Sequence, residues 1–173
     1  MPLKIKAIPL TAAKLNELFR YDGATGKLYN RVHISSRARE GAEAGCTGGC
    51  GYRQVRIVGV DYFTHRLIWK MRTGSDPVEE LDHINHDRAD NRIENMREAS
   101  GRENHMNLSR AKNNTSGVTG VCWQKLAQKW CAQIRVEGKQ VHLGYFTHFF
   151  HAVRARKLAE VGAGFHVNHG EAA

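Results

Sequence analysis

The chain has 173 residues, enough for one ordinary domain or two small ones. Lys and Arg outnumber Asp and Glu by 26 to 17, and the resulting formal net charge of +9 favours a polyanionic partner, nucleic acid first. Because no apolar run approaches the roughly 18 residues of a membrane-spanning helix, and Met1–Leu10 is too short and polar for a signal peptide, we expect a soluble cytoplasmic protein without a membrane partner.

The first predicted element is a short amphipathic helix. Leu15, Leu18 and Phe19 recur at helical spacing after Thr11, and the helix should end before the turn-rich residues 21–26. We expect this helix to serve packing only.

Residues 35–51 are rich in Gly, Ala, Arg and Glu, which predicts an exposed loop in which Arg37 and Arg39 are candidates for phosphate contact. Alternation then predicts a strand over 52–58, and helical periodicity predicts a helix from 65 to 71 that stops at Gly74.

Residues 81–104 carry the most informative pattern. It has three parts, Leu81-Asp82-His83-Ile84-Asn85, Asp90-Asn91-Arg92-Ile93-Glu94-Asn95-Met96-Arg97 and Arg102-Glu103-Asn104. A single Asp-His pair is also typical of a capped turn, and asparagines are common turn formers. Three parts in this order on a basic chain favour a functional site instead.

This pattern resembles the HNH nuclease family, particularly its phage and intron-encoded homing-endonuclease branch, over roughly 65–107. The resemblance implies a ββα-metal fold that hydrolyses phosphodiester bonds. It assigns His83 as the general base, Asn95 as the middle Asn, and Asp82 with Asn104 as metal ligands. The chemistry agrees, because an imidazole can take a proton from water and a divalent cation can offset the charge on the phosphate.

The ligand types bear on which metal is bound. A carboxylate and an amide oxygen suit Mg²⁺ or Mn²⁺ better than zinc. HNH toxins that favour zinc-like ions carry a further His one turn beyond the last ligand, where this chain has Leu108. Adjacent residues on a strand point to opposite faces, so Asp82 and His83 serve one site only if the strand is twisted or the metal sits at its edge.

Three other histidines lie near the pattern in sequence. His65 also matches a position of the family, and we expect it to pack or contact phosphate rather than act in catalysis. His86 and His105 fit no part of the pattern.

Beyond the pattern, the polar stretch 110–116 predicts a basic linker, with Lys112 near DNA. Three strands are predicted over 120–124, 130–136 and 140–146, followed by a helix from about 148 to 161. The apolar stripe that should pack this helix on the sheet consists of Ala152, Ala155, Leu158 and Ala159.

Residues 114–168 resemble the ethylene-response-factor (APETALA-type) DNA-binding domain. The resemblance is carried by Ser116-Gly117-Val118-Thr119-Gly120-Val121-Cys122-Trp123, Lys129-Trp130-Cys131-Ala132-Gln133-Ile134-Arg135, Val141-His142-Leu143-Gly144-Tyr145-Phe146 and Ala152-Val153-Arg154-Ala155-Arg156. It implies a three-stranded sheet laid into the major groove. By position it assigns DNA contact to Thr119, Gln124, Lys125, Lys129, Gln133, Arg135 and His142.

Plant members differ from this chain at three positions, so their target sequence is not carried over. They have Arg at the positions of Thr119 and Cys122, and Trp at the position of His142. The large apolar residues of the segment are expected in the core: Trp123, Trp130, Leu143 and Phe146.

The four cysteines raise the question of zinc. Cys46 and Cys50 flank three residues, and Cys122 and Cys131 lie in predicted strands. Neither spacing favours a structural zinc site.

Together these patterns predict an α+β chain with a central ββα-metal (HNH) motif, followed by a three-stranded antiparallel sheet with a helix. We expect an HNH nuclease domain over 1–109 with its core at 65–107, a linker at 110–116 and a DNA-binding domain over 117–173. The predicted function is a Mg²⁺- or Mn²⁺-dependent endonuclease that acts as a monomer on duplex DNA. RNA is less expected, because stacking surfaces for single strands are not evident. The alternatives are a catalytically silent DNA-binding regulator and a zinc-stabilised interaction protein.

Overall fold

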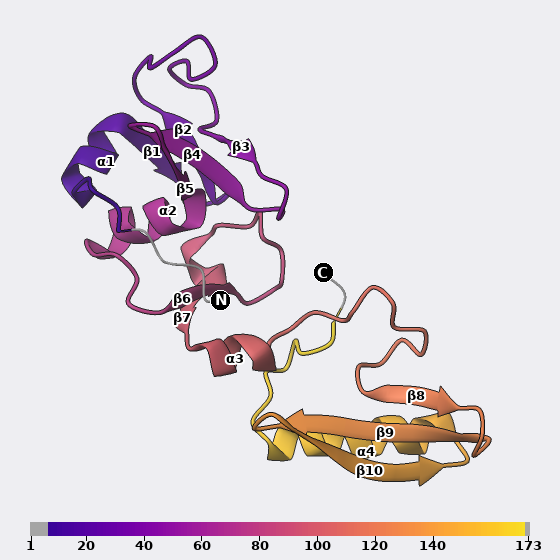
Figure 1. Ribbon diagram of the computed structural model, residues 1–173. Coiled ribbons are helices and arrows are strands. Elements are labelled where there is room, and N and C mark those ends of the chain that lie inside the picture. Colours follow the sequence, from indigo (N-terminus) through magenta and orange to yellow (C-terminus); the bar gives the residue numbers. More distant parts are fainter. Residues whose placement is uncertain (1–6, 172–173) are drawn as a thin grey trace. The chain divides into compact units, whose positions relative to one another are not determined.

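The computed structural model describes residues 7–171, so the first six residues of Met1–Leu10 lie outside the described residues. The chain divides into two compact units, Met1–Ser100 and Gly101–Ala173 (Figure 1). Small antiparallel sheets and short helices build both units, which confirms the α+β class. None of the helices in residues 7–171 is long and apolar enough to cross a membrane.

The first unit combines two β-hairpins, a small sheet and two α-helices. Its elements are α1 (Ala12–Leu18), β1 (Phe19–Asp22), β2 (Lys27–Asn30), β3 (Cys46–Thr47), β4 (Arg53–Ile57), β5 (Val60–Phe63), α2 (Thr64–Thr73), β6 (Glu80–His83), the 3-10 helix η1 (Ile93–Asn95) and β7 (Met96–Ala99). Strand β1 pairs with β2, β6 pairs with β7, and β3, β4 and β5 form a sheet in that order; all pairs are antiparallel.

Both helices of this unit begin or end where the sequence predicts. The Thr11 side chain accepts a hydrogen bond from the Lys14 backbone N–H at 3.2 Å and so caps α1. Gly74 has a φ of +87° and donates its N–H to the Lys70 carbonyl, which ends α2 in the left-handed conformation that glycine adopts readily. Phe19, predicted as part of the first helix, starts β1 instead.

A single apolar core joins the elements of the first unit. Its fully buried large side chains are Leu15, Phe19, Leu28, Leu67 and Ile68. Met96 of β7 belongs to the same core and lies opposite His83 in the β6–β7 pairing. The hairpin that carries Asp82 and His83 is therefore anchored to the core.

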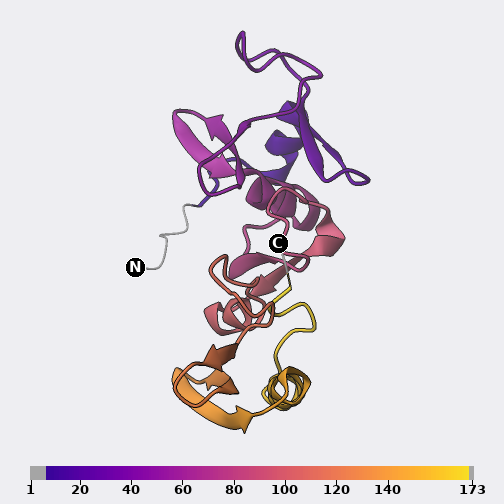
Figure 2. The same cartoon turned by 90° about the vertical axis from the view of Figure 1, so that its right-hand side faces the viewer.

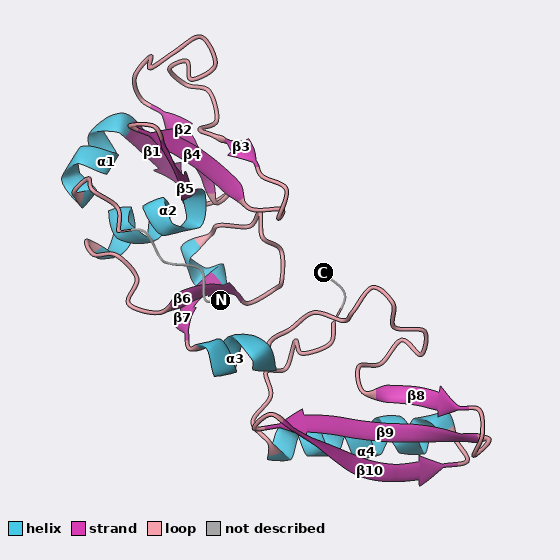
Figure 3. Cartoon of the chain, viewed as in Figure 1, coloured by secondary structure: helices cyan, strands magenta, loops and turns pink. Residues whose placement is uncertain are grey.

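The second unit begins with a short helix and continues as a sheet covered by a longer helix (Figure 3). Its elements are α3 (Gly101–Met106), β8 (Val121–Gln124), β9 (Lys129–Val136), β10 (Lys139–Phe146) and α4 (Phe149–Gly162). The strands pair antiparallel in the order β10-β9-β8. All three predicted strands and the predicted helix are confirmed to within one or two residues.

Helix α4 covers one face of this sheet, as the view along its axis shows (Figure 2). Val121, Ala132 and Ala152 are the buried centre of the contact. The predicted stripe was wrong in one member, because Leu158 is 63% exposed while Arg156 and Glu160 are buried on the inner side. Arg156 can be buried because its Nε donates to Glu160 at 2.8 Å and its Nη1 donates to a backbone carbonyl of β9.

The large apolar residues of the sheet also differ in burial. Trp130, Leu143 and Phe146 pack against this core as predicted. Trp123 is 42% exposed, because it lies on the edge strand β8, although its ring contacts Trp130 at 5.3 Å.

Residues 110–116, predicted as a linker, are hydrogen-bonded within the second unit. The Arg110 N–H donates to the Glu171 carbonyl, and the Asn114 side chain accepts from the Gly117 N–H at 2.7 Å. The C-terminal segment returns to the same region, because His166 and Gly170 donate their N–H groups to the carbonyls of Met106 and Leu108. The second compact unit begins at Gly101, so residues 110–116 lie inside it.

Candidate active site

The β6–β7 hairpin presents Asp82 and His83 in different surroundings. Asp82 lies opposite Arg97, whose Nε and Nη2 both donate to Asp82 Oδ2, at 3.1 and 2.9 Å. His83 is 4% exposed and lies at the end of β6. The two side chains thus follow the alternation expected of a strand.

Asn91 holds the imidazole of His83. Its Oδ1 lies 3.0 Å from His83 Nε2, and both residues are buried. Because an amide oxygen only accepts hydrogen bonds, this contact places the ring hydrogen on Nε2 and the lone pair on Nδ1. Nδ1, the other ring nitrogen, has almost no exposed surface.

Aromatic rings surround His83 on its other sides. The ring of His65 lies 5.2 Å away edge-on, and the ring of Tyr52 lies 5.8 Å away. His65 is 7% exposed and stacks on Phe63 at 5.3 Å. Burial first, then His83 and Arg66, lower the pKa of His65 to about 3, so this ring is neutral at ordinary pH. Such burial favours packing over phosphate contact for His65.

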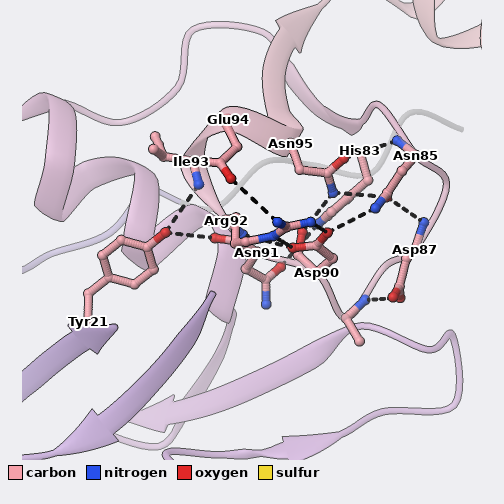
Figure 4. Close-up of polar contacts among 11 residues, drawn as sticks. Tyr21, His83, Asn85, Asp87, Asp90, Asn91, Arg92, Ile93, Glu94 and Asn95 are labelled. Atoms are coloured by element: carbon pink, nitrogen blue, oxygen red, sulfur yellow. Dashed lines mark hydrogen bonds and ion pairs between the residues drawn. The ribbon is translucent and has the colours of Figure 1, made fainter. Parts of the chain in front are cut away.

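A hydrogen-bond network closes the loop between β6 and β7 (Figure 4). The Asn95 side chain donates to Asn85 Oδ1 at 2.9 Å and to the Asp90 carbonyl at 2.8 Å, and it accepts from the Asn85 N–H at 3.0 Å. Hydrogen bonds from the Arg92 side chain, chiefly, lower the pKa of Asp90 to about 2. Asn95, predicted as part of the catalytic set, uses its side chain in these bonds to connect its end of the loop to Asn85 and Asp90.

The two predicted metal ligands lie in different units. Asp82 is in β6 of the first unit, and Asn104 is half-buried in α3 of the second. Within residues 7–171, no group of three or more His, Cys, Asp or Glu side chains is arranged to hold a metal ion. The four cysteines, at 46, 50, 122 and 131, are all free thiols.

The exposed face of the β8–β10 sheet is the second candidate site. Strand pairing places Gln124 opposite Lys129 and Gln133 opposite His142, and Arg135 shares their side of β9. These five predicted residues lie on the face away from α4, since Trp130, Ala132 and Ile134 alternate with them toward the helix side. The face therefore presents amide, imidazole and cationic groups together.

The remaining predicted DNA contacts lie elsewhere. Lys125 is exposed in the β8–β9 turn, and Lys112 is exposed in the 110–116 segment. Arg37 and Arg39 are exposed in the loop between β2 and β3. Thr119 precedes β8, and its hydroxyl is buried rather than presented on the sheet face.

Sequence reasoning missed several residues that the structure brings to these sites. Asn91 stands inside the recognised pattern, in the Asn91-Arg92 pair, and could have been weighed beside Asn95. Gln140 faces Arg135 and Tyr145 faces Cys131 across the sheet, so strand pairing adds both to the exposed face. Tyr21 contacts the backbone of residues 91 and 93, and it belongs to none of the sequence motifs described above.

Comparison with known proteins gives a match over the segment that contains Asp82 and His83. Residues 62–106 match the HNH endonuclease family. The chain is 33% identical to protein 3.8 of Escherichia phage T7 over 100 residues, which are 57% of this chain and 74% of that protein. No solved structure gives a significant match. The chain therefore belongs to the family of phage T7 protein 3.8, and it carries an HNH endonuclease domain at residues 62–106.

Proposed function

We propose that this protein is a metal-dependent endonuclease that hydrolyses phosphodiester bonds in duplex DNA. One observation carries the proposal: within the HNH domain, His83 ends β6 and Asn91 Oδ1 lies 3.0 Å from its Nε2, so the ring of the proposed general base is held in one orientation. In this role His83 takes a proton from the attacking water.

The proposed metal ligands are Asp82 and Asn104. A carboxylate and an amide carbonyl are both oxygen donors, which Mg²⁺ and Mn²⁺ prefer, and waters and a phosphate oxygen would complete the coordination. When bound, the cation offsets the negative charge that builds on the phosphate and the leaving oxygen. Arg97 Nη2 lies 2.9 Å from Asp82 Oδ2, so a positive charge already stands beside this carboxylate.

We further propose that the second unit binds the duplex through the exposed face of its sheet, in the manner of the ethylene-response-factor domain. The support is the shared face of Gln124, Lys129, Gln133, Arg135 and His142. Amide and guanidinium groups can form paired hydrogen bonds with base edges in the major groove. Lys112, Arg37 and Arg39 are assigned to the phosphate backbone, where a positive charge suffices.

A plasmid cleavage assay tests the nuclease proposal. The wild type should cleave with Mg²⁺ or Mn²⁺ and lose activity in a chelator. His83→Ala should lower the cleavage rate by roughly 10²- to 10⁴-fold, because it removes the general base, and should leave DNA affinity nearly unchanged. His105→Ala is the matched control, since His105 is exposed on α3.

Three outcomes would contradict parts of the proposal. A His83→Ala protein that keeps more than about a tenth of the wild-type rate would refute the role of His83. A wild type that binds duplex DNA and cleaves none with either ion would be a regulator. Stoichiometric zinc in the purified protein would favour a zinc-stabilised interaction protein.

A further inference from the structure

The β1–β2 hairpin contacts the loop that holds His83, although it lies outside the HNH match at 62–106. The Tyr21 hydroxyl donates to the Asn91 carbonyl at 3.3 Å and accepts from the Ile93 N–H at 3.1 Å. Figure 4 shows Tyr21 reaching from β1 to both groups. One side chain thus ties the backbone on either side of Arg92 to the hairpin.

The turn of the same hairpin packs against the same backbone. Gly26 has a φ of +71°, and a Cβ atom there would lie 2.6 Å from the Arg92 backbone nitrogen and 2.9 Å from the Asn91 carbonyl carbon. Only glycine allows so close an approach. The hairpin therefore supports the loop both by hydrogen bonds and by direct backbone contact.

Asn91 contacts both the β1–β2 hairpin and the proposed base, His83. Its backbone contacts the hairpin, while its side chain accepts the hydrogen bond of His83 Nε2. Asn91 is buried, so water has little access to replace either contact. A displacement of the Asn91 backbone would change the position of the His83 ring.

We propose that the β1–β2 hairpin is a positioning element of the nuclease site, in which Tyr21 and Gly26 set the Asn91 backbone so that its side chain orients His83. The proposal rests on the proposed function, because orientation of His83 matters to the rate only if His83 acts on the attacking water. Tyr21 touches neither DNA nor water in this role, so it is a positioning residue.

The first test compares two tyrosines of the hairpin in the full-length protein. Tyr21→Phe keeps the ring and removes both hydrogen bonds. Tyr29→Phe is the matched control on β2, where the ring contacts the Arg20 guanidinium at 4.6 Å. We expect Tyr21→Phe to lower kcat about 10- to 100-fold, since small misplacements of catalytic groups have effects of this order, with KM and DNA affinity unchanged. Tyr29→Phe should match the wild type.

The second test uses two glycines of the same turn. Gly26→Ala forces a methyl group into the backbone of residues 91 and 92, whereas Gly23→Ala meets only the Tyr21 ring at 3.7 Å, an ordinary contact. We expect Gly26→Ala to lower kcat as Tyr21→Phe does, and Gly23→Ala to leave it unchanged. If Gly26→Ala does not fold, the tyrosine pair still decides the question.

A readout without cleavage separates this proposal from the proposed function. The side-chain amide resonance of Asn91 and the imidazole resonances of His83 should shift in Tyr21→Phe and stay in place in Tyr29→Phe. A wild type without nuclease activity would refute the function and leave these shifts to test the positioning. If the Tyr21→Phe protein keeps the wild-type kcat, or if these resonances do not move, the hairpin only packs against the loop and the proposal is wrong.

Discussion

Burial of His65 should make the stability of the first unit depend on pH. Its ring is buried between Phe63, Tyr52 and His83, and burial is the main reason why its pKa falls to about 3, against about 6.5 in an unfolded chain. Between these two values the unfolded chain binds a proton that the folded chain does not. The contribution of the neutral His65 ring to the stability of the folded state is therefore fully present above pH 6.5 and is lost as the pH falls toward 3.

We predict that the protonation of His65 in the unfolded chain lowers the free energy of unfolding by about 1.4 kcal/mol for each unit by which the pH falls from 6 to 4. His65→Phe should remove this part of the slope, because phenylalanine fits an aromatic contact and does not titrate. Urea unfolding across this pH range measures it, with exposed His105→Phe as the control. Equal slopes in the wild type and in His65→Phe would show that His65 does not titrate as its burial implies.

The connection between α3 and β8 is part of the second unit. The C-terminal segment donates one backbone hydrogen bond to the end of α3, from His166 to Met106, and one to this connection, from Gly170 to Leu108. A fragment that starts at residue 110 lacks both acceptors, whereas a fragment over 101–173 keeps them. The boundary at Gly101 is therefore the one to use in dissecting the protein.

We predict that both fragments bind duplex DNA at low salt without added metal, because both contain the exposed sheet face. The 101–173 fragment should be the more stable, by about 1 kcal/mol for each retained hydrogen bond. Thermal unfolding and fluorescence anisotropy measure the two properties. A folded 101–173 fragment that does not bind duplex DNA would remove the sheet from the proposed function.

Positive charge over the whole molecule should make DNA binding depend on salt. The net charge is +9, and residues 97–173 carry 11 Lys and Arg against 5 Asp and Glu. Counterion release makes each phosphate contact count toward the slope of affinity against salt. Phosphate contacts and base contacts are then distinguishable by measurement.

We predict that Lys112→Ala weakens binding to all duplexes alike and reduces the salt slope by about one unit. Arg135→Ala should instead change the preference among sequences, because Arg135 lies on the exposed face of β9 beside Gln133. Affinities for two unrelated duplexes across a salt series test both expectations. A uniform loss in Arg135→Ala would assign that residue to the phosphate backbone.

Local patterns were enough to predict most elements and the recognised nuclease pattern. Periodicity placed α2 and its end at Gly74, alternation placed β8, β9 and β10, and the order of Asp82, His83 and the later asparagines indicated an HNH domain. These features depend on residues close in sequence, where backbone geometry sets the spacing of side chains. The same reasoning misplaced Leu158, because the alanine pattern of α4 does not reveal that Arg156 finds buried partners in Glu160 and a β9 carbonyl.

The groups around the proposed base come from distant parts of the first unit and meet through folding. The family pattern with Asp82 and His83 can be recognised from the sequence alone, but the sequence leaves open which asparagine contacts the imidazole. In the folded protein Asn91 makes that contact, whereas the Asn95 side chain binds Asn85 and the Asp90 carbonyl within the loop. It also brought Tyr21 to a backbone carbonyl 70 residues away. No local preference encodes such a contact, because it forms only when the shared core fixes the β1–β2 hairpin and the loop in one unit.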